Sequence, residues 1–187
     1  MLTYSICLTN LSERRTILIG GGEVAQRKAE ALLAAGGHPV VISPALTPQL
    51  EEWVQQGKLS WLPRPYQSGD LSGAFLVIAA TDQPEVNQAV WEEAQQIGSL
   101  INVVDDPAHS NFIVPATFQR GPITVAITTG GGSPALARHL REQLQAALPP
   151  EIGTLAEILA EFERQSGNRL LDMRREFGER PVDAPLR

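Results

Sequence analysis

Short apolar runs alternate with longer stretches of helical periodicity through the first half of the chain. The apolar runs predict β-strands at 16–19, 39–42, 59–62, 75–80 and 100–104. Apolar residues at helical spacing predict helices between them, at 23–35, 47–56 and 84–97. Thr47 followed by Pro48 is a typical helix start, and Asp82 is expected to cap the third helix. This alternation predicts an α/β fold built on a doubly wound parallel sheet.

The pattern changes after Asp105, where consecutive apolar segments are no longer separated by a helix. The segments 112–115 and 123–128 are predicted to be strands. A turn at 119–122, which contains Gly121 and Pro122, lies between them. We therefore expect an antiparallel hairpin here.

Helical stretches make up the rest of the chain. Ser133 and Pro134 predict the start of a helix that ends near residue 147, where Pro149 and Pro150 stop it. Two further helical stretches are predicted at 152–165 and 169–177. The chain is thus expected to have three parts: a sheet domain at 1–112, a small α+β domain at 113–149 and a C-terminal helical segment at 150–187.

Composition narrows the class of protein. Apolar residues make up 43% and charged residues 19% of the chain, as in an ordinary globular protein. The net charge of −6 argues against non-specific binding of nucleic acid. No run is long and apolar enough for a membrane span, and the first residues lack the features of a signal peptide. With Cys7 as the single cysteine, an intrachain disulfide is excluded, and the three histidines share no metal-ligand spacing. We expect a cytoplasmic protein without a permanent metal.

A glycine loop between the first strand and the first helix is the clearest chemical signal. Gly20, Gly22 and Ala25 match the pattern G-x-G-x-x-G/A in the strand–turn–helix context that the motif requires. The first glycine permits a tight turn and the second lets a diphosphate approach the backbone. The helix N-terminus at Glu23 and Val24 offers free N–H groups to phosphate. A tight turn with no ligand is the alternative.

The ends of the other strands define the rest of a dinucleotide site. The second strand is followed by Ser43, Pro44 and Ala45, where related motifs carry an acidic residue for the ribose. Ser43 can bond a ribose hydroxyl, and the lack of arginine there favours NAD over NADP. Thr81 and Asn102 are expected to contact the cofactor from the loops after later strands.

Four blocks of sequence resemble one known family. GGGEVAQRKAEALL, AATDQPEVNQAV, INVVDD with FIVP after it, and ITTGGGSPALARHLRE follow one another in this order. They are similar to the precorrin-2 dehydrogenases of sirohaem synthesis, including the dehydrogenase/ferrochelatase portion of sirohaem synthases. The resemblance covers roughly 1–150 and implies a Rossmann-like domain, a dimerisation domain and a stand-alone form of the enzyme. It implies NAD-dependent oxidation of precorrin-2 to sirohydrochlorin, with Fe²⁺ insertion in several members. It also implies a homodimer with a swapped middle domain.

Asp105 is the candidate catalytic residue. It follows the strand at 100–104, so its carboxylate is expected at the carboxyl edge of the sheet, where it can act as a general base. In the family, the aspartate directly after Asn-Val-Val is implicated in catalysis, and Asp105 occupies that position. The alternative is that Asp105 only caps a turn before Pro107. His109 is either a proton carrier or a surface histidine.

The second glycine loop, at 128–134, is a candidate for binding the acidic side chains of a tetrapyrrole. It lacks the lysine of a phosphate-binding P-loop. Thr129 and Ser133 are expected to contact substrate carboxylates, together with Arg120 and Arg138. The alternative for each arginine is a solvated surface charge.

Two other functions stay open on the sequence. One is a non-catalytic NAD-sensing module, although no helix-turn-helix or basic patch is visible. The other is a small dehydrogenase for a different substrate, although neither Tyr4 nor Tyr66 has a lysine four residues later.

Overall fold

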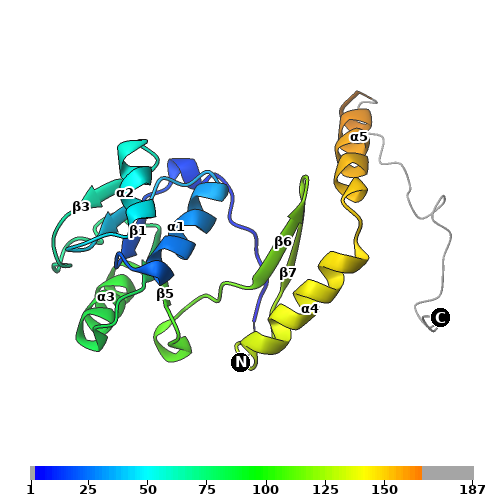
Figure 1. Cartoon of the computed structure of the whole chain (residues 1–187). Coiled ribbons are helices and arrows are strands. Elements are labelled where there is room, and N and C mark those ends of the chain that lie inside the picture. Colours follow the sequence, from blue (N-terminus) through cyan, green and yellow to red (C-terminus); the bar gives the residue numbers. More distant parts are fainter. Residues whose placement is uncertain (1–2, 166–187) are drawn as a thin grey trace. The chain divides into compact units, whose positions relative to one another are not determined.

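The computed structural model describes residues 3–165 of the chain, shown with its element labels in Figure 1. These residues form two compact units that divide between Val114 and Pro115. The helix predicted at 169–177 lies outside the described residues. No helix in the described range is both long and apolar enough to cross a bilayer.

The first unit is built on five parallel strands. They are β1 (Thr16–Ile19), β2 (Val40–Ile42), β3 (Ser60–Leu62), β4 (Leu76–Ala79) and β5 (Leu100–Val103), in the spatial order β3-β2-β1-β4-β5. The helices α1 (Glu23–Ala34), α2 (Pro48–Gln55) and α3 (Pro84–Ile97) connect them. The predicted doubly wound parallel sheet is therefore confirmed. The chain order reverses between β1 and β4, which is where such sheets place their ligands.

Two apolar layers cover the two faces of this sheet. Alternate residues of β1 point to opposite faces, so Leu18 packs with Ala25 and Ala29 of α1. Ile17 and Ile19 contribute to the other layer, which also contains Val90 and Ala94 of α3. All four residues of β1 and of β4 are buried, as expected for strands covered on both sides.

The helix starts are partly as predicted. The hydroxyl of Thr47 accepts a hydrogen bond from the Leu50 N–H, with Pro48 at the first helical position. Asp82 does not cap α3: the cap position is Gln83, whose own N–H donates to the Thr81 hydroxyl at 3.1 Å. The prediction for Asp82 is wrong, because Asp82 lies one residue before the cap position and α3 begins without a side-chain cap.

The second unit contains a hairpin and two helices. The strands β6 (Ala116–Arg120) and β7 (Ile123–Ile127) are antiparallel, and α4 (Pro134–Ala147) and α5 (Glu151–Gln165) follow. The antiparallel hairpin was predicted, and so was the helix start, where the Ser133 hydroxyl accepts from the Leu136 N–H.

The strand predicted at 112–115 does not form. The first strand of the hairpin begins at Ala116. Phe112 instead packs against the core of the first unit, and Pro115 has no N–H to contribute to a ladder. The apolar run at 112–115 therefore belongs to a connecting segment, in which Phe112 and Ile113 are half-buried and Val114 is exposed, and not to a strand.

A partly exposed ion pair in the β3–β4 connection is expected to make the stability of the first unit sensitive to acid. The Arg64 guanidinium donates to both carboxylate oxygens of Asp70 at 2.7 Å. These hydrogen bonds, opposed by burial, hold the pKa of Asp70 below its ordinary value. A depressed pKa stabilises the fold above the unfolded-state value, and this stabilisation is lost as the pH falls through the folded-state value.

We therefore expect the free energy of unfolding to decrease as the pH is lowered below about 4. Asp70→Asn should be less stable than the parent near neutral pH and should lose part of this acid dependence. Urea unfolding at a series of pH values measures both effects. Parallel pH curves for the two proteins would contradict the role of Asp70.

Candidate functional site

A cleft of ≈ 740 Å³ opens at the carboxyl edge of the parallel sheet, within the first unit. The segments that follow β1, β2, β3, β4 and β5 all contribute to its wall. This volume lies within the usual range for small-molecule and cofactor sites. The cleft brings together nine of the predicted site residues: Gly20, Gly22, Glu23, Val24, Ser43, Pro44, Ala45, Thr81 and Asp105.

The first two glycines of the loop are required by the protein's own packing. Gly20 has a φ of 116°, and a Cβ there would lie 2.3 Å from the Ala80 carbonyl oxygen. A Cβ on Gly21 would lie 1.9 Å from the carbonyl oxygen of Ala45. The glycine loop therefore touches the loops after β2 and β4 at backbone distance, which holds three walls of the cleft together.

Gly22 is different, because within residues 3–165, its own chain neighbours aside, nothing lies within 4 Å of a Cβ built on it. It occupies the cap position of α1 and makes no side-chain cap, and the first backbone bond of the helix runs from Gln26 N–H to the Gly22 carbonyl. The N–H groups of the first turn consequently have no intrahelical partner. An open glycine beside free N–H groups at a helix N-terminus fits the diphosphate of a dinucleotide.

The loop after β2 is held in place by its own hydrogen bonds. Ser43 is only 8% exposed, and its hydroxyl donates to the Ala45 carbonyl at 2.8 Å. The Thr47 N–H donates to the Gly21 carbonyl at 3.0 Å, and the Trp61 indole donates to the Ser43 carbonyl at 2.9 Å. The lone pairs of the Ser43 hydroxyl remain available to a ribose hydroxyl.

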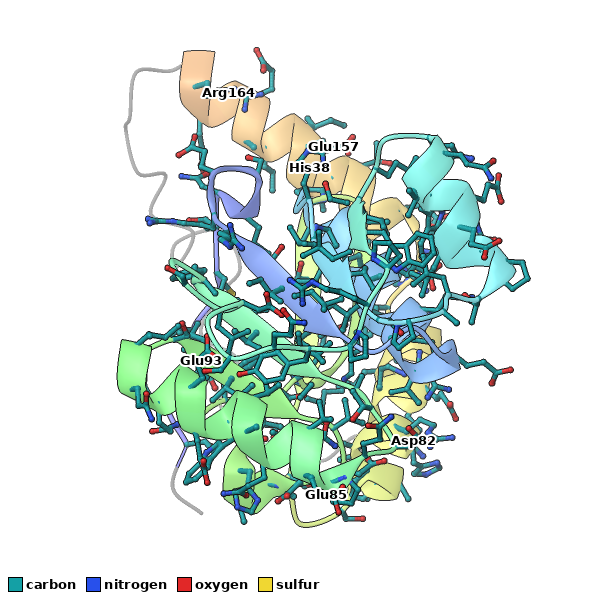
Figure 2. The ribbon with its side chains drawn as sticks, turned by 90° about the vertical axis from the view of Figure 1, so that its left-hand side faces the viewer. His38, Asp82, Glu85, Glu93, Glu157 and Arg164 are labelled. Carbon is teal, nitrogen blue, oxygen red and sulfur yellow. The ribbon has the colours of Figure 1, made fainter. Side chains whose placement is uncertain are left out.

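Tyr66 also lines the cleft, although the sequence did not identify it as a site residue. Its hydroxyl donates to the carboxylate of Glu93, a residue of α3 labelled in Figure 2. Glu93 also accepts from the Gly69 and Leu71 N–H groups at 2.9 Å each. Burial, together with the hydrogen bond to Glu93, raises the pKa of Tyr66, so the phenol stays neutral. Tyr66 lies in a proline-rich connection, and nothing in the neighbouring sequence indicates that it pairs with Glu93 on a distant helix.

Removal of the Glu93 carboxylate should destabilise the first unit. Glu93→Ala leaves the Gly69 and Leu71 N–H groups without their acceptor, and we expect a loss of about 2–3 kcal/mol in the free energy of unfolding. Glu92→Ala is the matched control, because Glu92 is exposed and accepts a hydrogen bond from Gln88 one turn away, at 2.7 Å. Urea unfolding compares the two, and equal losses would contradict the anchoring role of Glu93.

Asp105 lies at the end of β5 and faces the same cleft as the glycine loop. It is exposed, and its carboxylate has no hydrogen-bond or ion-pair partner within residues 3–165. Lys28 of α1 is half-buried: burial lowers the pKa of Lys28, while the negative charge of Asp105 raises it. The site therefore presents an available carboxylate with a cationic side chain in its electrostatic range.

Asn102 and His109 do not line the cleft. The Asn102 amide donates to the Phe112 carbonyl at 3.1 Å, which ties β5 to the segment beyond it. His109 pairs with Asp106 at 2.6 Å and packs edge-on against Trp91. That hydrogen bond from His109 holds the pKa of Asp106 below its ordinary value. His109 is thus engaged in local structure, which favours the second of its two sequence interpretations.

The predicted substrate residues of the second unit have mixed environments. The Thr129 hydroxyl accepts from the Ser133 N–H at 2.9 Å and donates to the Ser133 carbonyl at 3.1 Å, which shapes the second glycine loop. Arg120 donates to the Gln145 carbonyl at 3.0 Å, near the end of α4. Arg138 is exposed, with no hydrogen-bond or ion-pair partner among the residues described.

No group of three or more histidine, cysteine, aspartate or glutamate side chains within the described range is arranged to hold a metal ion. The cleft itself presents a helix N-terminus for an anion, together with three exposed acidic residues, Glu23, Asp82 and Asp105.

Comparison with known proteins agrees with this geometry. Residues 7–116 match a family described as putative NAD(P)-binding, and residues 120–147 match one described as sirohaem biosynthesis protein central. Siroheme synthase 1 of Aeromonas salmonicida is 43% identical over 98% of this chain, and siroheme synthase of Photorhabdus laumondii is 43% identical over 92%. The chain spans 40% and 37% of the length of these two relatives.

A solved structure of a protein named SirC, precorrin-2 dehydrogenase, has a TM-score of 0.75 and 25% identity, covering 95% of this chain and 86% of that one. The resemblance noted in the sequence is confirmed. The chain belongs to the putative NAD(P)-binding family, in the form that makes up the N-terminal region of sirohaem synthases.

Proposed function

We propose that this chain is an NAD-dependent precorrin-2 dehydrogenase of sirohaem or cobalamin synthesis. The observation that carries the proposal is the presence of the open glycine loop and the available Asp105 carboxylate in one ≈ 740 Å³ cleft. The names of the SirC dehydrogenase and of the sirohaem synthase relatives support the choice of substrate.

The proposed reaction removes a hydride and a proton from precorrin-2 to give sirohydrochlorin. When bound, NAD⁺ supplies the hydride acceptor. Gly22 and the first N–H groups of α1 hold the diphosphate, while Ser43 bonds a ribose hydroxyl. Asp105 accepts the proton at its carboxylate as a general base. Because the loop after β2 carries no arginine for a 2′-phosphate, NAD is preferred over NADP.

The substrate of this reaction carries acidic side chains, and we assign their recognition to the second unit. Arg138 is exposed and offers its whole guanidinium to a carboxylate. Arg120 retains donors beyond those it gives to α4. From the second glycine loop, Ser133 contributes its hydroxyl and Thr129 its backbone N–H, because the Thr129 hydroxyl and the Ser133 N–H already bond within the loop.

The decisive experiment is to mix the protein with precorrin-2 and NAD under anaerobic conditions and follow NADH and sirohydrochlorin by absorbance. Equal amounts of both products are expected. Reactions without precorrin-2, and with NADP in place of NAD, are the controls. If NAD binds but no NADH forms, the chain is better described as the non-catalytic NAD-sensing module.

Fe²⁺ insertion into sirohydrochlorin is the second activity that the resemblance implies. Asp105 is the carboxylate that it would use, and no separate feature of the described residues favours it. The proposal is therefore limited to the dehydrogenase. For the cellular compartment we propose the cytoplasm, since the single cysteine, Cys7, is a free exposed thiol.

We further propose that the second unit mediates formation of a homodimer. The helix α4 exposes Leu136, Leu140 and Leu144 at helical spacing, an apolar stripe that a second copy can cover. The protein should therefore run as a dimer in size-exclusion chromatography with light scattering. Leu140→Glu should shift it to monomer, while Ala135→Glu, which adds the same charge at an exposed position on the other side of α4, should not. A monomeric parent protein would contradict the proposal.

A further inference from the structure

Asp105 has an unusual backbone conformation. Its φ is 60°, in the left-handed region that residues with a side chain rarely occupy. Such a conformation persists only where the surrounding structure imposes it, and it is concentrated at functional sites. The contacts that impose it on Asp105 can be identified.

Ser110 ties the backbone on both sides of Asp105 together. Its hydroxyl accepts from the Val103 N–H at 2.9 Å and donates to the Asp106 carbonyl at 2.8 Å. The Asp106 N–H also donates to the Val103 carbonyl at 3.1 Å. The chain must therefore reverse within the two residues between Val103 and Asp106, and Asp105 is one of them.

The Asp106 side chain fixes the far side of this turn. It accepts from the N–H groups of Ala108 at 3.1 Å and His109 at 3.3 Å, within the 3₁₀ turn η2 (Pro107–His109). The His109 ring donates to the same carboxylate at 2.6 Å, and it packs at 4.8 Å against Trp91 of α3. The turn is thereby anchored to a helix of the first unit.

We propose that Ser110 and the Asp106–His109 pair are positioning residues, which hold Asp105 in the left-handed conformation and so direct its carboxylate into the cleft. The proposal rests on the role of Asp105 as the general base. Ser110, Asp106 and His109 act through Asp105 and touch neither cofactor nor substrate. None of the three lines the cleft.

The test starts from an uncharged change, so that electrostatic effects on Asp105 are avoided. Ser110→Ala should lower kcat about tenfold and leave the KM for NAD within about twofold. Ser110→Thr keeps the hydroxyl and should restore kcat. Ser99→Ala is the matched control, because the Ser99 hydroxyl donates to the Ala74 carbonyl at 2.6 Å at the other end of β5. An unchanged kcat in Ser110→Ala, or an equal loss in Ser99→Ala, overturns the proposal.

A double-mutant cycle separates positioning from general damage. If Ser110 acts through Asp105, Ser110→Ala should cause no further loss of kcat in the Asp105→Asn background. Independent, multiplicative losses would show that Ser110 acts on the site by another route, and they overturn the proposal.

A second cycle needs no substrate. Asp105→Gly removes the conformational cost of a side chain at φ 60°. In Ser110→Ala the turn can relax, so less of this cost is left to remove. The change in Tm caused by Asp105→Gly should therefore be about 3 °C more favourable in the parent than in Ser110→Ala. Equal changes in Tm on Asp105→Gly in both backgrounds would contradict the proposal that Ser110 holds Asp105 in its left-handed conformation. This cycle measures stability alone, so it tests the positioning role of Ser110 even if the protein does not oxidise precorrin-2. A failure to oxidise precorrin-2 would contradict the proposed function and would leave the result of this cycle unaffected.

Discussion

Asp105→Asn should lower the kcat of NADH formation by about 10²–10⁴-fold, the usual contribution of a general base. The Kd for NAD should stay within about twofold of the parent value, because the proposed site for the diphosphate is the glycine loop and not the end of β5. Asparagine has nearly the same shape and tolerates the left-handed region as well as aspartate does. The substitution therefore removes the proton acceptor and leaves the fold and the cleft in place.

The comparison needs a control that changes charge without touching the proposed base. Glu85→Gln serves this purpose, since Glu85 is exposed at the N-terminal end of α3 (Figure 2). It should retain the parent kcat. Stopped-flow absorbance gives kcat, and titration calorimetry gives the Kd for NAD. Full activity in Asp105→Asn would show that the proton leaves to another group or to water.

The sheet of the first unit could be predicted from the sequence because its strands are buried on both faces. Continuous apolar runs such as Leu76–Ala79 have no other common explanation when helices of regular periodicity separate them. Helix caps could be predicted where the side chain bonds an N–H group of the helix that it starts, as Thr47 and Ser133 do. Local patterns therefore predicted local structure and, through it, the edge of the sheet where the cleft forms.

The contacts that shape the cleft were less predictable, because they join distant residues. Nothing near Tyr66 in the sequence points to Glu93, its partner on α3. The left-handed conformation of Asp105 depends on Ser110, and aspartate is common enough in turns that its identity gives no warning. Asn102 was placed in the cleft on the basis of its strand alone, whereas its amide bonds the Phe112 carbonyl.

Gly22→Asp should abolish detectable NAD binding, with a loss of affinity of at least about 100-fold, while the protein remains fully folded. Gly22 has an ordinary φ of −85°, and its Cβ position is open, so the fold does not require glycine there. Aspartate is among the best helix caps, and its carboxylate would bond the same N–H groups that the diphosphate needs. The substitution should therefore leave Tm unchanged or raise it slightly, while its negative charge repels the ligand.

Two neighbouring variants make this result specific. Gly22→Asn adds a similar side chain without the charge, so its loss of affinity should be smaller than that of Gly22→Asp. Gly21→Ala places a Cβ 1.9 Å from the Ala45 carbonyl oxygen and should reduce stability by about 1–3 kcal/mol. We expect Gly22→Asp to lose NAD binding without losing stability, and Gly21→Ala to lose stability. This difference would show that the ligand requires glycine at position 22, whereas the fold requires it at position 21. If Gly22→Asp binds NAD as tightly as the parent in titration calorimetry, the diphosphate does not lie at the N-terminus of α1, and the orientation that directs the nicotinamide toward Asp105 is wrong.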